Sequence, residues 1–303
     1  MIPAVTPLKK ALTLDEAAVE RMFLHFQRNN VHPFILGTTG ESASLPLNVK
    51  KEYMRAATRY RKSDTVLYAG ISFNCLQESI DFAKYCADAG ADAAVATLPS
   101  YYTLTSAQMT AYFTQLADKI RLPLIVYNIP ATTHMSIPLE VIEVLSHHSN
   151  IAGVKDSERS EERLEQSLRL WKDRKDFSYF IGWAAKSAAA LLQGADGIIP
   201  STGNFLPAIY NEMQQAVAAG DAENANELQR LSDVFGNIYQ AGRTLGESLW
   251  ALKVLMDSAG LCEAYMMPPL QQGPAEDAQQ LVNDLMAHCA KENIQHGCEP
   301  KIY

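Results

Sequence analysis

Short apolar segments alternate with longer amphipathic segments over roughly the first 200 residues of the chain. Most of the apolar segments lack polar residues at alternate positions, which is typical of parallel strands covered on both faces. The pattern predicts eight strands, within residues 2–5, 33–37, 65–71, 92–98, 123–129, 151–155, 177–182 and 197–200. A strand–helix unit repeated about eight times is the signature of a (β/α)8 TIM barrel.

The segments between the predicted strands carry apolar residues every three to four positions, which indicates amphipathic helices. Residues 14–29 and residues 106–120 follow this period, and Ser106 is a candidate N-cap for the second of them. A doubly wound open sheet is the alternative fold. That fold usually carries a glycine-rich fingerprint after its first strand, and residues 4–10 contain none.

After about residue 206 the strand pattern stops, and four helical segments follow. They span residues 207–220, 221–242, 244–260 and 275–293. Gly220, Gly242 and Gly260 stand where glycine commonly ends a helix. We therefore expect residues 1–222 to form the barrel that carries the active site, and residues 223–303 to form a C-terminal helical domain.

The amino-acid composition limits the classes of partner that the protein is expected to bind. The chain has 303 residues, of which 48% are hydrophobic and 20% charged, as expected for a folded protein rather than a disordered one. A net charge of −8 without a basic cluster argues against nucleic acid and against an anionic membrane. No apolar run reaches the ~18–20 residues that span a bilayer. The five widely spread cysteines and the absence of an export signal in residues 1–10 predict a cytoplasmic protein.

Candidate chemistry lies at the ends of four of the predicted strands, where barrel enzymes place reacting groups. Residues 37–42, GTTGES, offer hydroxyls and backbone N–H groups to an anion, although a plain strand-to-helix turn is the alternative. Tyr101 and Tyr102 follow the fourth strand. They are either core or interface aromatics, or phenols that relay protons. Tyr127 lies at the end of the fifth strand, where a structural tyrosine is the simpler reading, and His134 reads as a loop histidine.

Lys155 ends the sixth apolar run, IAGVK. A salt-bridged or snorkelling lysine is one interpretation. The other is a Schiff-base amine. An ordinary lysine has a pKa of about 10.4, so only about one in a few thousand is neutral at pH 7. Desolvation inside a barrel disfavours the ammonium form, and a neutral amine attacks a ketone to give an iminium that withdraws electrons from the adjacent carbon.

These stretches together resemble the family of dihydrodipicolinate synthase and N-acetylneuraminate lyase, the Schiff-base pyruvate aldolases. The resemblance covers nearly the whole chain. It is carried, in order, by VTPL, GTTGES, the paired tyrosines, YNIP, GVKD and GADGIIPSTGN.

The resemblance implies roles for individual residues. Lys155 forms the Schiff base with a 2-oxo acid, and Tyr127 moves protons. Thr38 orients Tyr127, and Tyr102 completes the relay from the same or a neighbouring subunit. The remaining roles are binding of the carboxylate by Thr39 and the adjacent amides, including that of Gly40, and a backbone carbonyl from Ile199. No metal or other cofactor is implied, because the iminium is itself the electron sink, and a homotetramer or homodimer is implied.

Differences from the family pattern reduce the range of expected substrates. Thr132 stands where dihydrodipicolinate synthases typically carry an arginine, and His134 follows in place of a frequent glycine. Ala184 and Ala185 replace the Asp-Glu pair of sialic acid lyases. These differences favour a lyase for a 2-oxo-3-deoxy sugar acid. The residues expected around its distal end are Thr132, His134, Trp183, Lys186, Ser201 and Asn204.

Lys186 reads either as a contact for a distal carboxylate or as a solvent-facing helix lysine. Three alternatives to the sugar-acid lyase stay open. One is a dehydratase that uses the same lysine, and another is 4-hydroxy-tetrahydrodipicolinate synthase. The third, from another class, is a barrel that only binds a 2-oxo acid as a sensor.

Overall fold

The computed structural model describes residues 1–294 and separates into two compact units. The first unit comprises residues 66–200 together with Met1, and the second comprises residues 2–65 together with residues 201–294.

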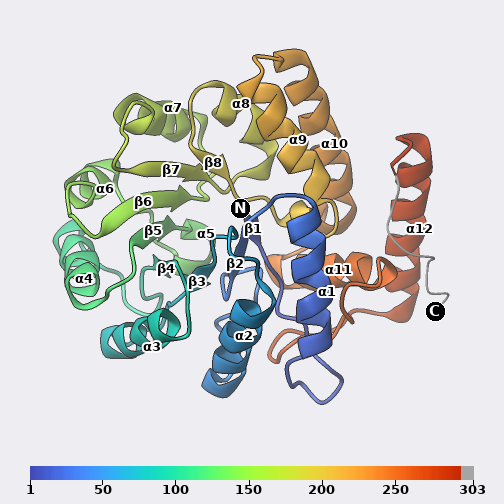
Figure 1. Ribbon diagram of the computed structural model, residues 1–303, viewed down its shortest axis with the longest axis horizontal. Helices are drawn as coiled ribbons and strands as arrows, with labels where there is room; N and C mark the ends of the chain where they lie inside the picture. The colour runs from blue at the N-terminus through green and yellow to red at the C-terminus, as the bar shows by residue number, and fades with distance from the viewer. Residues whose placement is uncertain (295–303) are drawn as a thin grey trace. The chain divides into compact units, whose positions relative to one another are not determined.

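The first unit is a parallel sheet with helices between its strands. The strands are β3 (Tyr68–Gly70), β4 (Ala93–Thr97), β5 (Leu124–Asn128), β6 (Ile151–Asp156), β7 (Ser178–Ile181) and β8 (Gly197–Ile198), each paired in parallel with the next in chain order. The helices are α3 (Leu76–Asp88), α4 (Ser106–Lys119), α5 (Pro130–Thr133), α6 (Leu139–Leu145), α7 (Glu161–Trp171), the 3-10 turn η1 (Ala184–Lys186) and α8 (Ser187–Leu192). Figure 1 shows α3, α4, α6 and α7 along the outer side of these strands.

Small and apolar residues let these strands lie close together. All five residues of β5 are buried, as are most of those of β4 and β6. At Gly153 in β6, a Cβ atom would lie 2.5 Å from the carbonyl oxygen of Ser178 in β7, so only glycine permits this approach. Helix α4 begins one residue earlier than its sequence suggests. Thr105, not Ser106, is the N-cap, because Thr105 and Gln108 form a reciprocal capping box.

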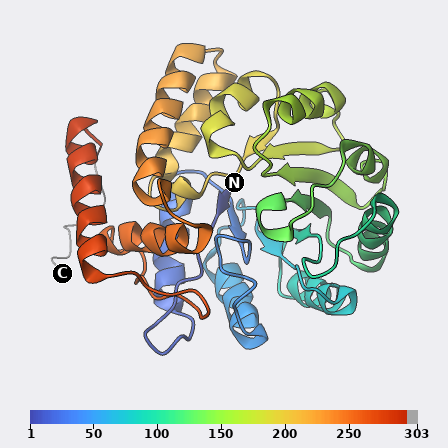
Figure 2. The same ribbon diagram turned by 180° about the vertical axis from the view of Figure 1, so that it is seen from behind.

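The second unit contains two parallel strands and the C-terminal helices. Its elements are β1 (Ile2–Pro3), α1 (Glu16–Arg28), β2 (Pro33–Ile35), α2 (Leu47–Tyr60), the 3-10 turn η2 (Ser201–Asn204), α9 (Pro207–Ala218), α10 (Ala222–Gln240), α11 (Leu245–Ser258) and α12 (Ala275–Lys291). Helix α1 packs on α2, α9 packs on α10, and α11 packs on α10 and α12. Figure 2 shows this last group from behind. Gly220, Gly242 and Gly260 follow α9, α10 and α11 with φ of 75°, 71° and 70°, as predicted for helix ends.

The eight predicted strands and the four C-terminal helical segments are all present, and the doubly wound alternative is wrong. The fold is a (β/α)8 barrel with a C-terminal helical extension. Helix α10 begins at Ala222, and the expected domain boundary after that residue stays a prediction. Within residues 1–294, no helix combines the length and hydropathy needed to cross a bilayer.

Candidate active site

The first unit brings Tyr127 and Lys155 together. Tyr127 in β5 is the direct partner of Lys155 in β6, so their side chains project from the same face of the sheet. The Nζ atom of Lys155 lies 3.9 Å from the centroid of the Tyr127 ring, a cation–π arrangement. Each residue is only 4% exposed. The amine is thus held in a largely dry environment, beside a side chain that ends in a phenol.

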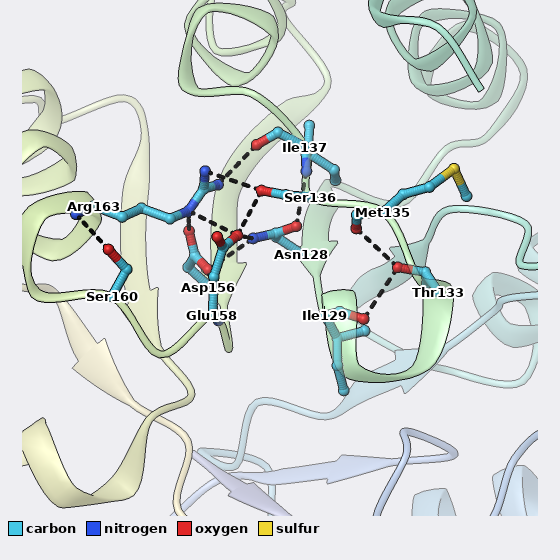
Figure 3. A network of polar contacts seen from close by, with 10 residues as sticks. All are labelled: Asn128, Ile129, Thr133, Met135, Ser136, Ile137, Asp156, Glu158, Ser160 and Arg163. Carbon is cyan, nitrogen blue, oxygen red and sulfur yellow. Dashed lines mark hydrogen bonds and ion pairs between the residues drawn. The ribbon is translucent and has the colours of Figure 1, made fainter. Parts of the chain in front are cut away.

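A buried polar network begins one residue beyond each of these side chains (Figure 3). Asn128 follows Tyr127, and Asp156 follows Lys155. The Asn128 amide nitrogen donates to Asp156 Oδ1 at 2.9 Å and to Glu158 Oε2 at 3.0 Å. Asn128 and Asp156 are both buried. The network therefore ties the ends of β5 and β6 together and fixes the strand register that sets Tyr127 against Lys155.

Arg163 in α7 balances the charge of Asp156. Its Nε atom donates to Asp156 Oδ2 at 2.6 Å, and the Arg163 side chain is itself mostly buried. Ser160 caps α7 by accepting from the Arg163 backbone N–H at 3.2 Å. A buried carboxylate needs both a counter-charge and hydrogen bonds, and Asp156 has both.

The same network anchors the segment that follows β5. The Ile137 N–H donates to Asn128 Oδ1 at 3.0 Å, and the Ile137 carbonyl accepts from Arg163 at 2.8 Å. Ser136 Oγ donates to Glu158 at 2.6 Å. This network was not predicted from the sequence. Its signal was the polar residue directly after each candidate reactive side chain, in YN and KD.

Thr132 and His134 lie in the anchored segment. Thr132 is half-buried, and its hydroxyl donates to the Ile129 carbonyl at 3.4 Å. His134 is exposed and ends α5 in a left-handed conformation, with φ of 57°.

Lys186 pairs with Glu161 and lies over the Trp183 ring, with 5.5 Å between Nζ and the ring centroid. This hydrogen bond lowers the pKa of Glu161 from its ordinary value. Lys186 therefore already has a carboxylate partner in α7, and its position does not require a distal carboxylate of the substrate.

The paired tyrosines are exposed. Tyr101 and Tyr102 are 78% and 73% exposed, and their rings meet edge to face with centroids 4.9 Å apart. Ile199, in contrast, is buried, and its N–H donates to the Ile181 carbonyl at 2.9 Å. A large aromatic pair that its own unit does not cover is available to another surface.

The second unit contains the GTTGES turn, residues 37–42, directly after β2. Thr38 and Thr39 are half-buried and Gly40 is buried. The Gly40 N–H donates to the Gly37 carbonyl at 3.1 Å, and the Thr6 hydroxyl donates to the Gly40 carbonyl at 2.6 Å. A Cβ atom at Gly40 would lie 3.0 Å from the carbonyl oxygen of Ala4, which explains the glycine. The turn is tightly built, and of its three hydroxyl side chains those of Thr38 and Thr39 are half-buried and that of Ser42 is buried.

Ser201 and Asn204 belong to η2 in the second unit. Ser201 Oγ lies 2.6 Å from the Tyr239 hydroxyl, whose pKa is raised by burial. The Asn204 amide donates to the Pro3 and Ser201 carbonyls at 2.9 and 2.8 Å and accepts from the Val5 N–H at 3.1 Å. These hydrogen bonds of Asn204 hold η2 against β1 and the residues that follow it.

Comparison with known proteins gives consistent likenesses. The model of the dihydrodipicolinate synthetase family matches residues 1–288. An uncharacterized DapA-like lyase from Thermofilum pendens is 32% identical over 228 residues, which is 74% of this chain and 76% of that protein. The dihydrodipicolinate synthase structure from Bacteroides thetaiotaomicron is 28% identical with a TM-score of 0.89, covering 94% of this chain and 97% of that one.

A second similar structure contains a ligand. The structure of YagE, a prophage protein of the dihydrodipicolinic acid synthase family from E. coli K12, was solved in complex with pyruvate. It is 25% identical with a TM-score of 0.88, covering 94% of this chain and 97% of that one.

These likenesses agree on the class of protein, which is a lyase built on a (β/α)8 barrel. More narrowly, the chain belongs to the dihydrodipicolinate synthetase family.

Proposed function

We propose that the protein cleaves and forms a carbon–carbon bond between pyruvate and an aldehyde, through a Schiff base on Lys155. The observation that carries this proposal is the buried amine of Lys155 against the ring of Tyr127, on adjacent strands of the barrel. The pyruvate bound to a related barrel supports the choice of 2-oxo acid.

In the capture step, the neutral amine of Lys155 adds to the C2 carbonyl carbon of the 2-oxo acid. Tyr127 supplies a proton to the oxygen, and water leaves the carbinolamine to give an iminium. The iminium then accepts the electron pair of the C3–C4 bond as the C4 hydroxyl loses its proton. An aldehyde departs, and the enamine that remains takes a proton at C3 and is hydrolysed to pyruvate. No cofactor is required, since the iminium holds the electrons.

The other residues complete the same site in this proposal. Thr38 orients Tyr127, and Thr39 binds the 2-oxo acid carboxylate together with Gly40, which lets the substrate approach the backbone of the turn. Ile199 contributes a backbone carbonyl. The C-terminal ends of all strands in a (β/α)8 barrel share one face, which supports a joint role for residues that follow different strands.

Tyr102 supplies the last phenol of the relay. Its exposure fits a contribution to the site of a neighbouring copy in a homodimer or homotetramer. The cytoplasmic location belongs to the same proposal and rests on the odd number of scattered cysteines.

The aldehyde that we propose is a polyhydroxylated one, so that the cleaved substrate is a 2-oxo-3-deoxy sugar acid. Thr132 stands where synthases carry an arginine for the partner's carboxylate, and a hydroxyl suits a sugar hydroxyl better than a carboxylate. Thr132 and Ser201 are the proposed contacts to this part. The synthase alternative is tested by growth rescue of a diaminopimelate auxotroph, and we expect no rescue.

Deuterium exchange tests the Schiff base without knowledge of the aldehyde. Enamine formation in D2O replaces the C3 hydrogens of pyruvate, so wild-type protein should deuterate the methyl group, and Lys155→Ala should not. Absence of exchange with folded wild-type protein contradicts the proposal.

Product analysis then separates the lyase from the dehydratase alternative. In the dehydratase, the C3 proton and the C4 hydroxyl leave as water and the carbon chain stays intact. We expect free pyruvate when the protein is incubated with 2-oxo-3-deoxy sugar acids. A dehydrated product that retains every carbon atom supports the dehydratase instead.

A further inference from the structure

The second unit contains a buried ion pair that the chemistry described above does not use. Lys253 in α11 is 0% exposed and pairs with Glu41, which is 3% exposed. The Lys253 Nζ atom also donates to the Tyr265 carbonyl at 2.7 Å, and Glu41 Oε2 accepts from the Met267 N–H at 2.8 Å. The pair therefore joins the C-terminal extension to the turn of residues 37–42.

The turn and Leu36, the residue before it, adopt a backbone conformation that two of their residues disfavour. Leu36 and Glu41 both have positive φ, 59° and 56°. A left-handed backbone is unfavourable for residues with a Cβ atom, above all for bulky ones such as leucine, and persists only where surrounding contacts enforce it. The Thr6 hydroxyl holds the turn at Gly40, and the pair with Lys253 holds it at Glu41.

The pair is not simply a source of stability. Replacing a buried ion pair by apolar side chains of similar volume is often neutral or stabilising, because desolvation of the two charges offsets their attraction. Such a pair is better explained by the geometry that it fixes. Here the fixed element is Glu41, two residues after Thr39, and the Glu41 N–H donates to the Thr38 carbonyl at 3.0 Å.

We propose that Lys253 is a positioning residue that holds the 37–42 turn, through Glu41, in the conformation that binds the carboxylate of the 2-oxo acid. This inference rests on the proposed function, because it needs Thr39 and its neighbouring amides to meet that carboxylate. The C-terminal extension would then take part in substrate binding. Its helix α11 carries Lys253, and Lys253 fixes the conformation of the anion-binding turn through Glu41.

Reductive trapping of pyruvate measures this role. Wild-type protein and Lys253→Met are incubated with borohydride over a range of pyruvate concentrations, and the adduct is quantified by mass spectrometry. A displaced turn weakens carboxylate binding, so the pyruvate concentration for half-maximal trapping should rise by about 10- to 100-fold. A merely structural role would lower the amount of protein that can be trapped without changing that concentration.

A matched control separates this effect from general destabilisation. Leu285 is fully buried in α12 of the same unit, and Leu285→Ala creates a cavity without touching the ion pair. We expect its half-maximal concentration to stay within about twofold of wild type. If Lys253→Met does not fold, the double variant Glu41→Gln/Lys253→Met, which leaves no unpaired charge, replaces it with the same expected shift.

The outcomes distinguish the two proposals. If wild-type protein traps pyruvate and the Lys253 variant has an unchanged half-maximal concentration, the positioning role is wrong and the proposed function stands. An equal shift in Leu285→Ala also overturns the positioning role. If folded wild-type protein traps no pyruvate, the proposed function fails, and the positioning role fails with it.

Discussion

Lys155 and Lys253, two of the three buried lysines among the described residues, have different surroundings. Lys253, in the second unit, is paired with the Glu41 carboxylate and donates to a backbone carbonyl. Lys155, in the first unit, lies against the face of the Tyr127 ring, and the next residue along its strand, Asp156, belongs to the network of Asn128. Lys253 thus ties two segments of the second unit together, whereas Lys155 lies beside the side chain that we propose as its proton carrier. Burial alone therefore does not mark a reactive amine, and the partner of the amine is the more informative observation.

The largest expected effect is the loss of turnover when Lys155 is replaced. Lys155→Met removes the nucleophile and should lower turnover by at least about 1,000-fold, because no other group supplies the covalent step. Circular dichroism should show an intact fold. Turnover near the wild-type rate would contradict the assignment of Lys155.

Tyr127→Phe tests the ring and the hydroxyl separately. Phenylalanine keeps the aromatic face against Lys155 and removes the proton carrier. We expect a loss of about 10²- to 10⁴-fold in kcat, which is the usual size of a general acid–base contribution. Pyruvate should still be trapped on Lys155, more slowly. Unchanged kcat would exclude Tyr127 from proton transfer.

Lys253→Met should affect stability more than Lys155→Met does. Removing one partner leaves the Glu41 carboxylate buried without its counter-charge, at a cost of about 3–5 kcal/mol in the free energy of unfolding. The double variant Glu41→Gln/Lys253→Met should recover most of this loss. Urea denaturation of Lys155→Met, Lys253→Met and the double variant measures both effects. A Lys253→Met variant as stable as wild type would show that Lys253 and Glu41 do not form an ion pair.

Asn128→Ala tests the network behind the reactive lysine. It removes two donors from the Asp156 and Glu158 carboxylates and leaves the Ile137 N–H without its acceptor. We expect about 1–3 kcal/mol lower stability, as for other buried polar groups that lose a partner. Asn150, whose amide donates to three carbonyls in the same unit, provides the control. Urea denaturation should show that both variants are destabilised, but only Asn128→Ala should lower kcat, because only Asn128 lies in the network that sets Tyr127 against Lys155.

The smallest effect reports on the surroundings of Lys253. Burial raises the pKa of the Cys262 thiol to about 12, and Lys253 partly offsets this shift. Thiolate is the reactive form, so Cys262 should stay almost unmodified by a thiol reagent at pH 8, while exposed Cys75 reacts quickly. Peptide mapping after labelling checks this order. Rapid labelling of Cys262 in the native protein would show that this region opens readily.

Features that depend on local sequence pattern could be predicted from the sequence. Contacts between residues far apart in the chain could not. The apolar runs gave the strands, and the position of Lys155 at the end of one gave the candidate amine. The N-cap of α4 was misplaced by one residue, since Thr105 and Ser106 are both acceptable caps and only the geometry of Gln108 decides between them. Glu41 and Lys253 lie far apart in the chain, and no periodicity connects them.

The central claim is that one buried amine, that of Lys155, captures the ketone. Wild-type protein is incubated with pyruvate and borohydride, digested, and mapped by mass spectrometry. Reduction of the Schiff base adds about 72 Da to one lysine. We predict this mass on the peptide with Lys155 and not on the peptide with Lys253. An adduct on Lys253 or another lysine, or unmodified protein, would contradict the account.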